Sequence, residues 1–213
     1  MKLSGIKVII WDFDNTLFRI IPELTKDVRN AELAVIISHT GWSVEKAAEQ
    51  FYNLYHRIYA SATQTAAHLA GITFTEASVE MENYYDRKKY LSRDEKLIGM
   101  FAGLVTYRNM ILTNGVSAKV RETLPVLGIS PSIFELIATS EITGTNKPDP
   151  AAFEFILSRT GLPAGAHLMV GDREDVDIEP AKSVGMHTCL VWGKGRISEY
   201  SLPSVYDVPL ILE

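Results

Sequence analysis

Residues 7–17 read KVIIWDFDNTL, an apolar run that opens into two carboxylates separated by one residue. The apolar part, residues 8–11, does not alternate with polar residues, which is typical of a strand buried on both faces of a parallel sheet. Asp12 and Asp14 therefore follow the carboxyl end of this strand, where open α/β sheets bind their ligands. The position indicates a functional site in which one of the two acids can act as a nucleophile.

The composition limits the class of protein. The 213 residues are 46% hydrophobic and 22% charged, which suits one domain with a sizeable insertion or two small domains. There is no run of about 18 apolar residues and no signal-peptide pattern, so we expect a cytoplasmic protein without a membrane partner, as a monomer or small homo-oligomer. The net charge of −5 argues against a nucleic-acid partner. Cys189 lies in an apolar stretch and is expected to be buried and inert.

Short apolar stretches alternate with helical patterns over most of the chain. We expect further strands at residues 110–112, 133–138, 167–170 and 188–192. Helices are expected from a capping box at residues 92–95 to Gly103, from Ser117 to Gly128, over residues 151–160 behind the N-cap Asp149, and up to Gly185. This alternation predicts an α/β fold, a Rossmann-like parallel sheet with helices on both faces.

One region departs from the alternation and is helical throughout. Its first helix is expected to open at Pro22 and to close at Gly41. A second is expected over residues 44–70, where apolar side chains recur at three- and four-residue steps up to Ile58 and Tyr59 and Gly71 ends the pattern. A third should cover residues 76–89. We therefore predict two parts: residues 1–18 and 91–213 as the α/β core, and residues 19–90 as a helical insertion.

Four segments of the core carry polar residues where strands or loops end: residues 12–16, 113–115, 146–148 and 171–177. Because the carboxyl ends of parallel strands share one edge of the sheet, these segments can converge on one ligand. Their combined chemistry is that of phosphoryl transfer, in which a carboxylate accepts the phosphoryl group and a lysine and Mg²⁺ neutralise charge. Magnesium prefers hard oxygen ligands, and Asp12 and Asp172 would supply the charged ones.

With these motifs in this order, the sequence resembles the haloacid dehalogenase-like hydrolase superfamily, most closely its phosphatase branch. The resemblance rests on four motifs: Asp12-x-Asp14-x-Thr16, Thr113 after an apolar strand, Lys147, and Gly171-Asp172 followed by Asp177. It implies a magnesium-dependent phosphomonoester hydrolase that acts on a small phosphorylated metabolite through an aspartyl phosphate. The insertion lies between the first and second motifs, where this family places a helical cap that selects the substrate.

The resemblance also implies a role for each acid of the first motif. Asp12 would be the nucleophile, and Asp14 would protonate the leaving oxygen and then activate water. The metal would bind the carboxylates of Asp12 and Asp172 together with the main-chain carbonyl of Asp14. Dehalogenases of this family lack the second acid, so Asp14 favours a phosphatase.

The remaining motif residues are expected to hold the phosphate. The resemblance implies that Thr113, the main-chain amide of Asn114 and Lys147 bind its oxygens, and that Asp177 orders the lysine or a metal-bound water. Asp175 departs from the family pattern and is interpreted as an acid stabilised by the start of a helix.

Two other functions stay open at this point. A phosphomutase of the same superfamily shares the pair of aspartates and differs in letting a sugar hydroxyl replace water. A non-catalytic binding module is disfavoured by the complete set of motifs, because a binder needs no nucleophile beside a proton shuttle. Within the insertion no substrate-binding residue is assigned; the side chains considered are Arg19, His39, His56, Arg57 and His68.

Overall fold

The structure, a computed structural model, describes residues 2–55, 57 and 61–213. The chain divides into two compact units, one made of Met1–Arg19 and Leu91–Glu213 and the other of Ile20–Tyr90. They are called the core unit and the helical unit below. None of the described helices combines the length and the apolar character that crossing a membrane requires.

Within the described part of the core unit, six strands form one parallel sheet in the order β3-β2-β1-β4-β5-β6. The strands are β1 (Val8–Trp11), β2 (Arg108–Leu112), β3 (Phe134–Ala138), β4 (His167–Gly171), β5 (His187–Val191) and β6 (Tyr200–Leu202). The predicted parallel α/β sheet is confirmed. Strand β1 is central and pairs with β2 on one side and β4 on the other, so the first motif lies between the second and the fourth.

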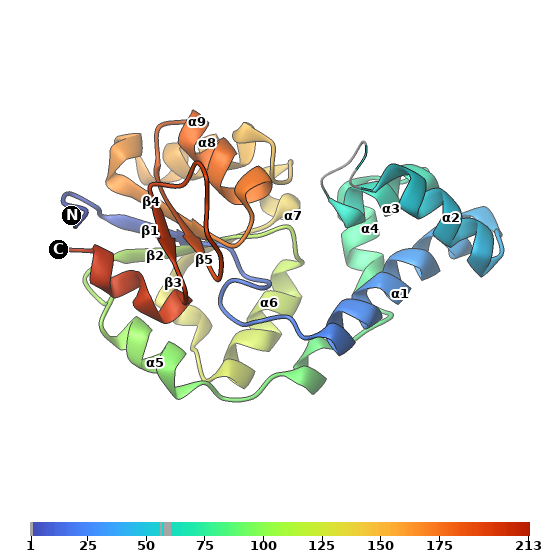
Figure 1. Cartoon of the computed structure of the whole chain (residues 1–213), viewed down its shortest axis with the longest axis horizontal. Helices are drawn as coiled ribbons and strands as arrows, with labels where there is room; N and C mark the ends of the chain where they lie inside the picture. The colour runs from blue at the N-terminus through green and yellow to red at the C-terminus, as the bar shows by residue number, and fades with distance from the viewer. Residues whose placement is uncertain (1, 56, 58–60) are drawn as a thin grey trace. The chain divides into compact units, whose positions relative to one another are not determined.

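Helices cover both faces of the sheet (Figure 1). They are α5 (Glu95–Ala102), α6 (Ser117–Thr123), α7 (Ser140–Thr143), α8 (Pro150–Thr160) and α9 (Glu179–Ser183). Val8 and Ile10 of β1 belong to one buried cluster with Phe153 of α8. The alternate residue Trp11 packs against Phe101 of α5, with ring centroids 5.3 Å apart. Burial on both faces explains why β1 is apolar at every position.

The start of α5 corrects a prediction. The capping residue is Asp94 and not Ser92, because the Asp94 carboxylate accepts hydrogen bonds from the amides of Lys96 (2.9 Å) and Leu97 (3.0 Å). The main-chain amide of Asp94 itself donates to Leu127 O at 3.1 Å. The residue that caps α5 is therefore the acid directly before the helix, two residues later than predicted.

Helix α6 also differs from the prediction at both ends. Ser117 is its first residue and not its cap, and Ser117 donates its main-chain amide to Glu141 at 2.8 Å. The α-helix ends at Thr123 and continues as a 3-10 helix, Leu124–Leu127, because Pro125 has no amide hydrogen to donate. Gly128, with φ of +82°, ends this segment as predicted.

The helical unit contains α1 (Pro22–Thr40), α2 (Val44–Leu54), α3 (Ala62–Ala70), α4 (Phe74–Met81) and a 3-10 helix, Arg87–Tyr90. Helix α1 opens at Pro22 and closes at Gly41, as predicted. Its residue Glu32 is 2% exposed and pairs with Arg29, whose Nη1 lies 2.5 Å from the Glu32 carboxylate. Burial raises the pKa of Glu32 to about 7, although Arg29 opposes the shift.

The single helix predicted over residues 44–70 is wrong. The chain leaves helix α2 at Tyr55, which is extended, and Ser61 caps α3 by accepting the amide of Gln64 at 3.3 Å. The apolar spacing continues across this break, so spacing alone did not show it. Ile58 and Tyr59, on which the prediction also rested, lie outside the described residues.

Helix α4 is shorter than the predicted third helix and starts earlier. It is opened by a capping box in which Thr73 Oγ1 accepts the amide of Glu76 (3.2 Å) and the Glu76 carboxylate accepts the amide of Thr73 (2.8 Å). It ends at Met81, eight residues before the predicted end at Lys89.

Candidate active site

Asp12 directly follows β1, and its carboxylate is held from two sides. Its main-chain amide donates to Val170 O of β4 at 2.9 Å, and the residue is only 7% exposed. One carboxylate oxygen, Oδ2, accepts the Thr16 hydroxyl at 2.8 Å, and the other, Oδ1, accepts the Lys147 ammonium at 2.7 Å. These two donors fix the orientation of the carboxylate.

Lys147 is buried and makes a second ion pair. Its Nζ lies 2.5 Å from Asp177 Oδ1, and the residue is 2% exposed. Burial opposes the charge of the ammonium, but the carboxylates of Asp12 and Asp177 outweigh it and raise the pKa of Lys147 above its ordinary range. Asn114 holds the lysine main chain, because its side chain accepts the Lys147 amide and donates to the Lys147 carbonyl, both at 2.8 Å. Lys147 is therefore a fixed positive charge beside Asp12.

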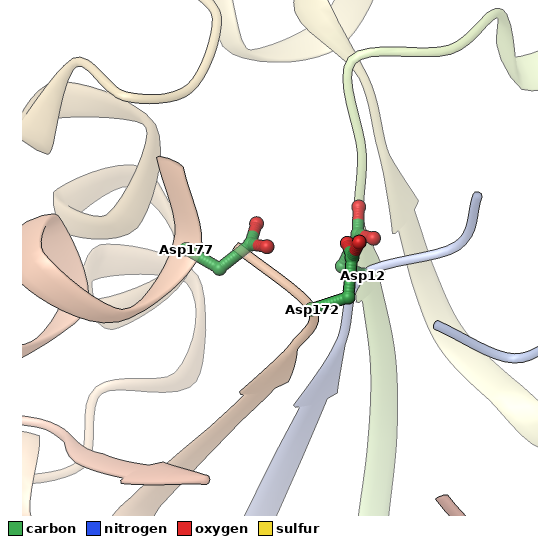
Figure 2. A group of neighbouring side chains, drawn as sticks. All are labelled: Asp12, Asp172 and Asp177. Carbon is green, nitrogen blue, oxygen red and sulfur yellow. The ribbon is translucent and has the colours of Figure 1, made fainter. Parts of the chain in front are cut away.

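Three carboxylates meet at this edge of the sheet. Oxygen atoms of Asp12, Asp172 and Asp177 lie within 4.8 Å of one another, with Asp12 and Asp172 at the ends of neighbouring strands and Asp177 on the helical turn Glu174–Ile178 (Figure 2). Burial, and then the charges of the other two acids, raise the pKa of Asp172 to about 7. Burial also raises the pKa of Asp177, against the opposing effect of Lys147. Burial is thus the main cause of both raised pKa values, and the negative charges of neighbouring acids add to it.

The group fits a divalent cation of the magnesium type. Its donors are carboxylate oxygens, which hard cations prefer, and a cation would offset the negative charges that contribute to the two raised pKa values. The predicted ligands Asp12 and Asp172 both belong to the group, and so does Asp177, the predicted neighbour of the lysine. The cluster contains side-chain oxygens only, whereas the ligand atom predicted for Asp14 is its main-chain carbonyl, so the role of Asp14 stays a prediction.

The structure brings the other predicted residues to the same sheet edge. Asp14 is half-buried in the loop after β1, where its main chain bridges to Phe18. Thr113 follows β2, the strand next to β1, and is 3% exposed. Its hydroxyl accepts the amide of Gly115 at 3.2 Å, so the turn after β2 folds back on the threonine.

Two residues that lie inside the predicted motifs, Asn15 and Gly171, have roles in the site that the sequence analysis did not assign. Asn15 has a φ of +62°, and its amide donates to Asp172 Oδ2 at 2.6 Å. Asparagine tolerates this left-handed conformation better than most residues, which is the signal that could have found it. Gly171 leaves room for Asp177, because a Cβ at Gly171 would lie 2.4 Å from Asp177 Cβ. The glycine before the fourth-motif acid is the corresponding sequence signal.

The residues left unassigned have ordinary surroundings. Asp175 is exposed, pairs with Arg173 at 3.0 Å and lies in the first turn of the helical segment Glu174–Ile178, which agrees with its interpretation as an acid at the start of a helix. His39 pairs with Glu80 at 2.7 Å. His56 lies outside the described residues. Cys189 is buried as expected, and burial raises the pKa of its thiol to about 12.

The fold and the site together define an α/β enzyme core with an oriented aspartate at the end of its central strand and an acidic group able to bind a cation. The chain belongs to the haloacid dehalogenase-like hydrolase family, whose model matches residues 6–185. The predicted family is confirmed.

Several relatives of known name cover much of the chain. A glyceraldehyde 3-phosphate phosphatase of Methanocaldococcus jannaschii is 34% identical over 67% of this chain, and the match spans 59% of that relative's length. A protein of the same name from Methanopyrus kandleri is 26% identical over 96% of this chain and 91% of the relative. Among solved structures, a HAD phosphatase from Thermococcus onnurineus is similar in fold, with a TM-score of 0.69, 22% identity and 97% of each chain covered.

Proposed function

We propose that this chain is a magnesium-dependent phosphomonoester hydrolase that works through an aspartyl phosphate on Asp12. The observation that carries the proposal is the Asp12 carboxylate, buried and oriented by Thr16 at 2.8 Å and Lys147 at 2.7 Å. An oriented carboxylate beside a fixed positive charge is suited to attack phosphorus. The relatives named as phosphatases support the same class of reaction.

In the first step, an Asp12 carboxylate oxygen forms a bond to phosphorus while the bond between phosphorus and the ester oxygen breaks. Asp14 gives its proton to the departing oxygen, which leaves as an alcohol. Thr113, the main-chain amide of Asn114 and Lys147 hold the phosphate oxygens. Lys147 suits this role because its ammonium already faces Asp12 and Asp177.

In the second step, Asp14 takes a proton from water, and the water oxygen bonds to phosphorus. The bond between phosphorus and Asp12 breaks, which frees inorganic phosphate and restores the carboxylate. One acid thus moves protons in both directions, as microscopic reversibility allows.

Magnesium would be held by the carboxylates of Asp12 and Asp172 and the main-chain carbonyl of Asp14, and it would supply positive charge to the transferring phosphoryl group. Asp177 acts through Lys147, to which it is bonded at 2.5 Å, and keeps the ammonium in place.

The substrate we propose is a small phosphorylated metabolite, selected by residues 20–90 acting as a cap. Glyceraldehyde 3-phosphate is the first ester to test, because relatives carry that name. A sugar phosphate, phosphoglycolate and a nucleoside monophosphate complete the panel. The cytoplasmic location and the monomer or small homo-oligomer stay predictions.

The test is phosphate release from this panel with and without Mg²⁺, for the wild type, Asp12→Asn and Asp175→Asn. We expect release from at least one ester only with the metal, a loss of at least ~10³-fold in Asp12→Asn, and wild-type rates in Asp175→Asn, a nearby exposed acid. No release from any ester refutes the hydrolase. Isomerisation of a sugar phosphate that depends on a bisphosphate, with little phosphate released, identifies the mutase instead.

A further inference from the structure

Trp192, directly after β5, has an unusual backbone conformation. Its φ is +65°, a left-handed value that a bulky residue rarely adopts and that surrounding contacts must hold. Its main-chain amide donates to Leu202 O of β6 at 3.0 Å, which anchors the residue to the edge of the sheet. The side chain is half-buried in the core unit.

The indole of Trp192 reaches the loop that carries the first motif. Its Nε1 donates to the main-chain carbonyl of Thr16 at 3.0 Å. The hydroxyl of the same Thr16 donates to Asp12 Oδ2 at 2.8 Å and lies 3.5 Å from Asp172 Oδ1. A continuous set of contacts thus runs from the edge of the sheet through Trp192 and Thr16 to the proposed nucleophile.

The indole ring is fixed by two further residues of the core unit. The guanidinium carbon of Arg19 lies 5.5 Å from the ring centroid, within cation–π range. Tyr206 packs edge-on against the ring, with centroids 5.7 Å apart. The Tyr206 hydroxyl donates to Asp94 at 2.6 Å, whereas the contact with the indole is made by the Tyr206 ring. The two ring contacts, from Arg19 and Tyr206, aim the indole N–H at Thr16.

We propose that Trp192 is a positioning residue for the reaction: through its indole N–H it fixes the main chain of Thr16 and so the orientation of the Asp12 carboxylate. The expected effect of Trp192 on turnover rests on the proposed function. The effect of Trp192 on the position of the loop does not depend on that function. Removing the N–H leaves the Thr16 carbonyl without this donor and weakens the hold of the loop on Asp12.

The test compares Trp192→Phe, which keeps an aromatic ring and loses the N–H, with Tyr206→Phe. The control loses one aromatic hydrogen bond in the same cluster, but its lost hydroxyl bonds Asp94 and not the loop. We expect kcat to fall about fivefold in Trp192→Phe with KM unchanged, the factor for one typical hydrogen bond, and to stay at the wild-type value in Tyr206→Phe.

Hydrogen exchange of the Thr16 and Leu17 amides gives a readout that needs no activity. Both amides donate to Phe13 O within the loop, at 3.3 and 3.1 Å. We expect about fivefold faster exchange in Trp192→Phe than in the wild type or in Tyr206→Phe. Unchanged exchange in Trp192→Phe, equal acceleration in the control, or a wild-type kcat in Trp192→Phe would overturn the proposal. If the wild type proved inactive, the proposed function would fail, and exchange would still decide whether Trp192 holds the loop.

Discussion

Replacing Lys147 by methionine tests the charge arrangement of the site most directly. The side chain keeps a similar length, and the two hydrogen bonds between its main chain and Asn114 are untouched. What disappears is the ammonium that contacts Asp12 at 2.7 Å and Asp177 at 2.5 Å. The change therefore removes one buried positive charge from among three carboxylates.

The structure sets the size of the expected effect. Lys147 and Asp177 are each 2% exposed as side chains, so water cannot replace the lost partner. Breaking a buried ion pair by removing one member costs ~3–5 kcal/mol, because an uncompensated charge remains. We expect the free energy of unfolding at pH 7 to fall by that amount. Mg²⁺ should restore part of it, since a cation that binds only the folded state stabilises it.

Urea unfolding followed by circular dichroism, with and without Mg²⁺, measures both quantities, and Lys182→Met serves as the control. Lys182 is exposed and donates a hydrogen bond to Ile197 O at the surface, so the loss of its ammonium should cost less than ~1 kcal/mol. A Lys147→Met protein within ~1 kcal/mol of the wild type would refute the reasoning. Without the ammonium, the three acids should depend more on the cation. Equal stabilisation by Mg²⁺ in the wild type and the variant would therefore refute the role of Lys147 as a counter-charge to the acids.

Two other changes test separate parts of the molecule. In Gly171→Ala the new Cβ would lie 2.4 Å from Asp177 Cβ. We therefore expect the free energy of unfolding to fall by ~1–3 kcal/mol and phosphate release to slow at least about tenfold. The control Gly165→Ala has open space at its Cβ and should behave as wild type in the same assays. Glu32, whose pKa rises from 4.5 to about 7 on burial, keeps its proton in the folded chain where the unfolded chain has lost it, so its share of stability falls as pH rises from 4.5 to 7. Thermal unfolding should show that the free energy of unfolding of Glu32→Gln gains on that of the wild type by up to ~3 kcal/mol between pH 5 and pH 8. The control Glu49→Gln, at an exposed position, should show no such gain. A difference in unfolding free energy between Glu32→Gln and the wild type that stays constant with pH would contradict the raised pKa of Glu32.

The core of the fold could be predicted because its strands are apolar runs that end in polar residues. β1 and β4 are buried at every position, and such runs show in the sequence without knowledge of their neighbours. The edge strand β6 was missed, because its three residues are partly exposed and carry no apolar pattern. The break between α2 and α3 was missed because side-chain spacing continues across it, although Ser61 is a recognisable cap.

The candidate site divides in the same way. Asp12, Asp172 and Lys147 could be found because their residue types are costly to bury and so require a reason. Asn15 and Gly171 are marked in the sequence only by their residue types, because their roles depend on a backbone angle and on an atom of another segment. The role proposed for Trp192 is also not visible in the sequence, because a half-buried tryptophan after a strand usually packs in a core. Its bond to Thr16 crosses 176 positions of sequence.

Charge balance explains why these residues occur together. A phosphate ester brings two negative charges to a place where three carboxylates lie within 4.8 Å of one another, and the ammonium of Lys147 offsets only one of them. Without more positive charge, the acids would repel the ester that Asp12 is proposed to attack. The pKa of Asp172 is raised first by burial and then by the charges of Asp12 and Asp177. A divalent cation held by Asp12 and Asp172 would bring the acids and the lysine together to neutrality, so the phosphate could approach the nucleophile. The proposed need for a metal thus agrees with the three acids that the chain gathers at this edge, whose charge the lysine alone does not balance.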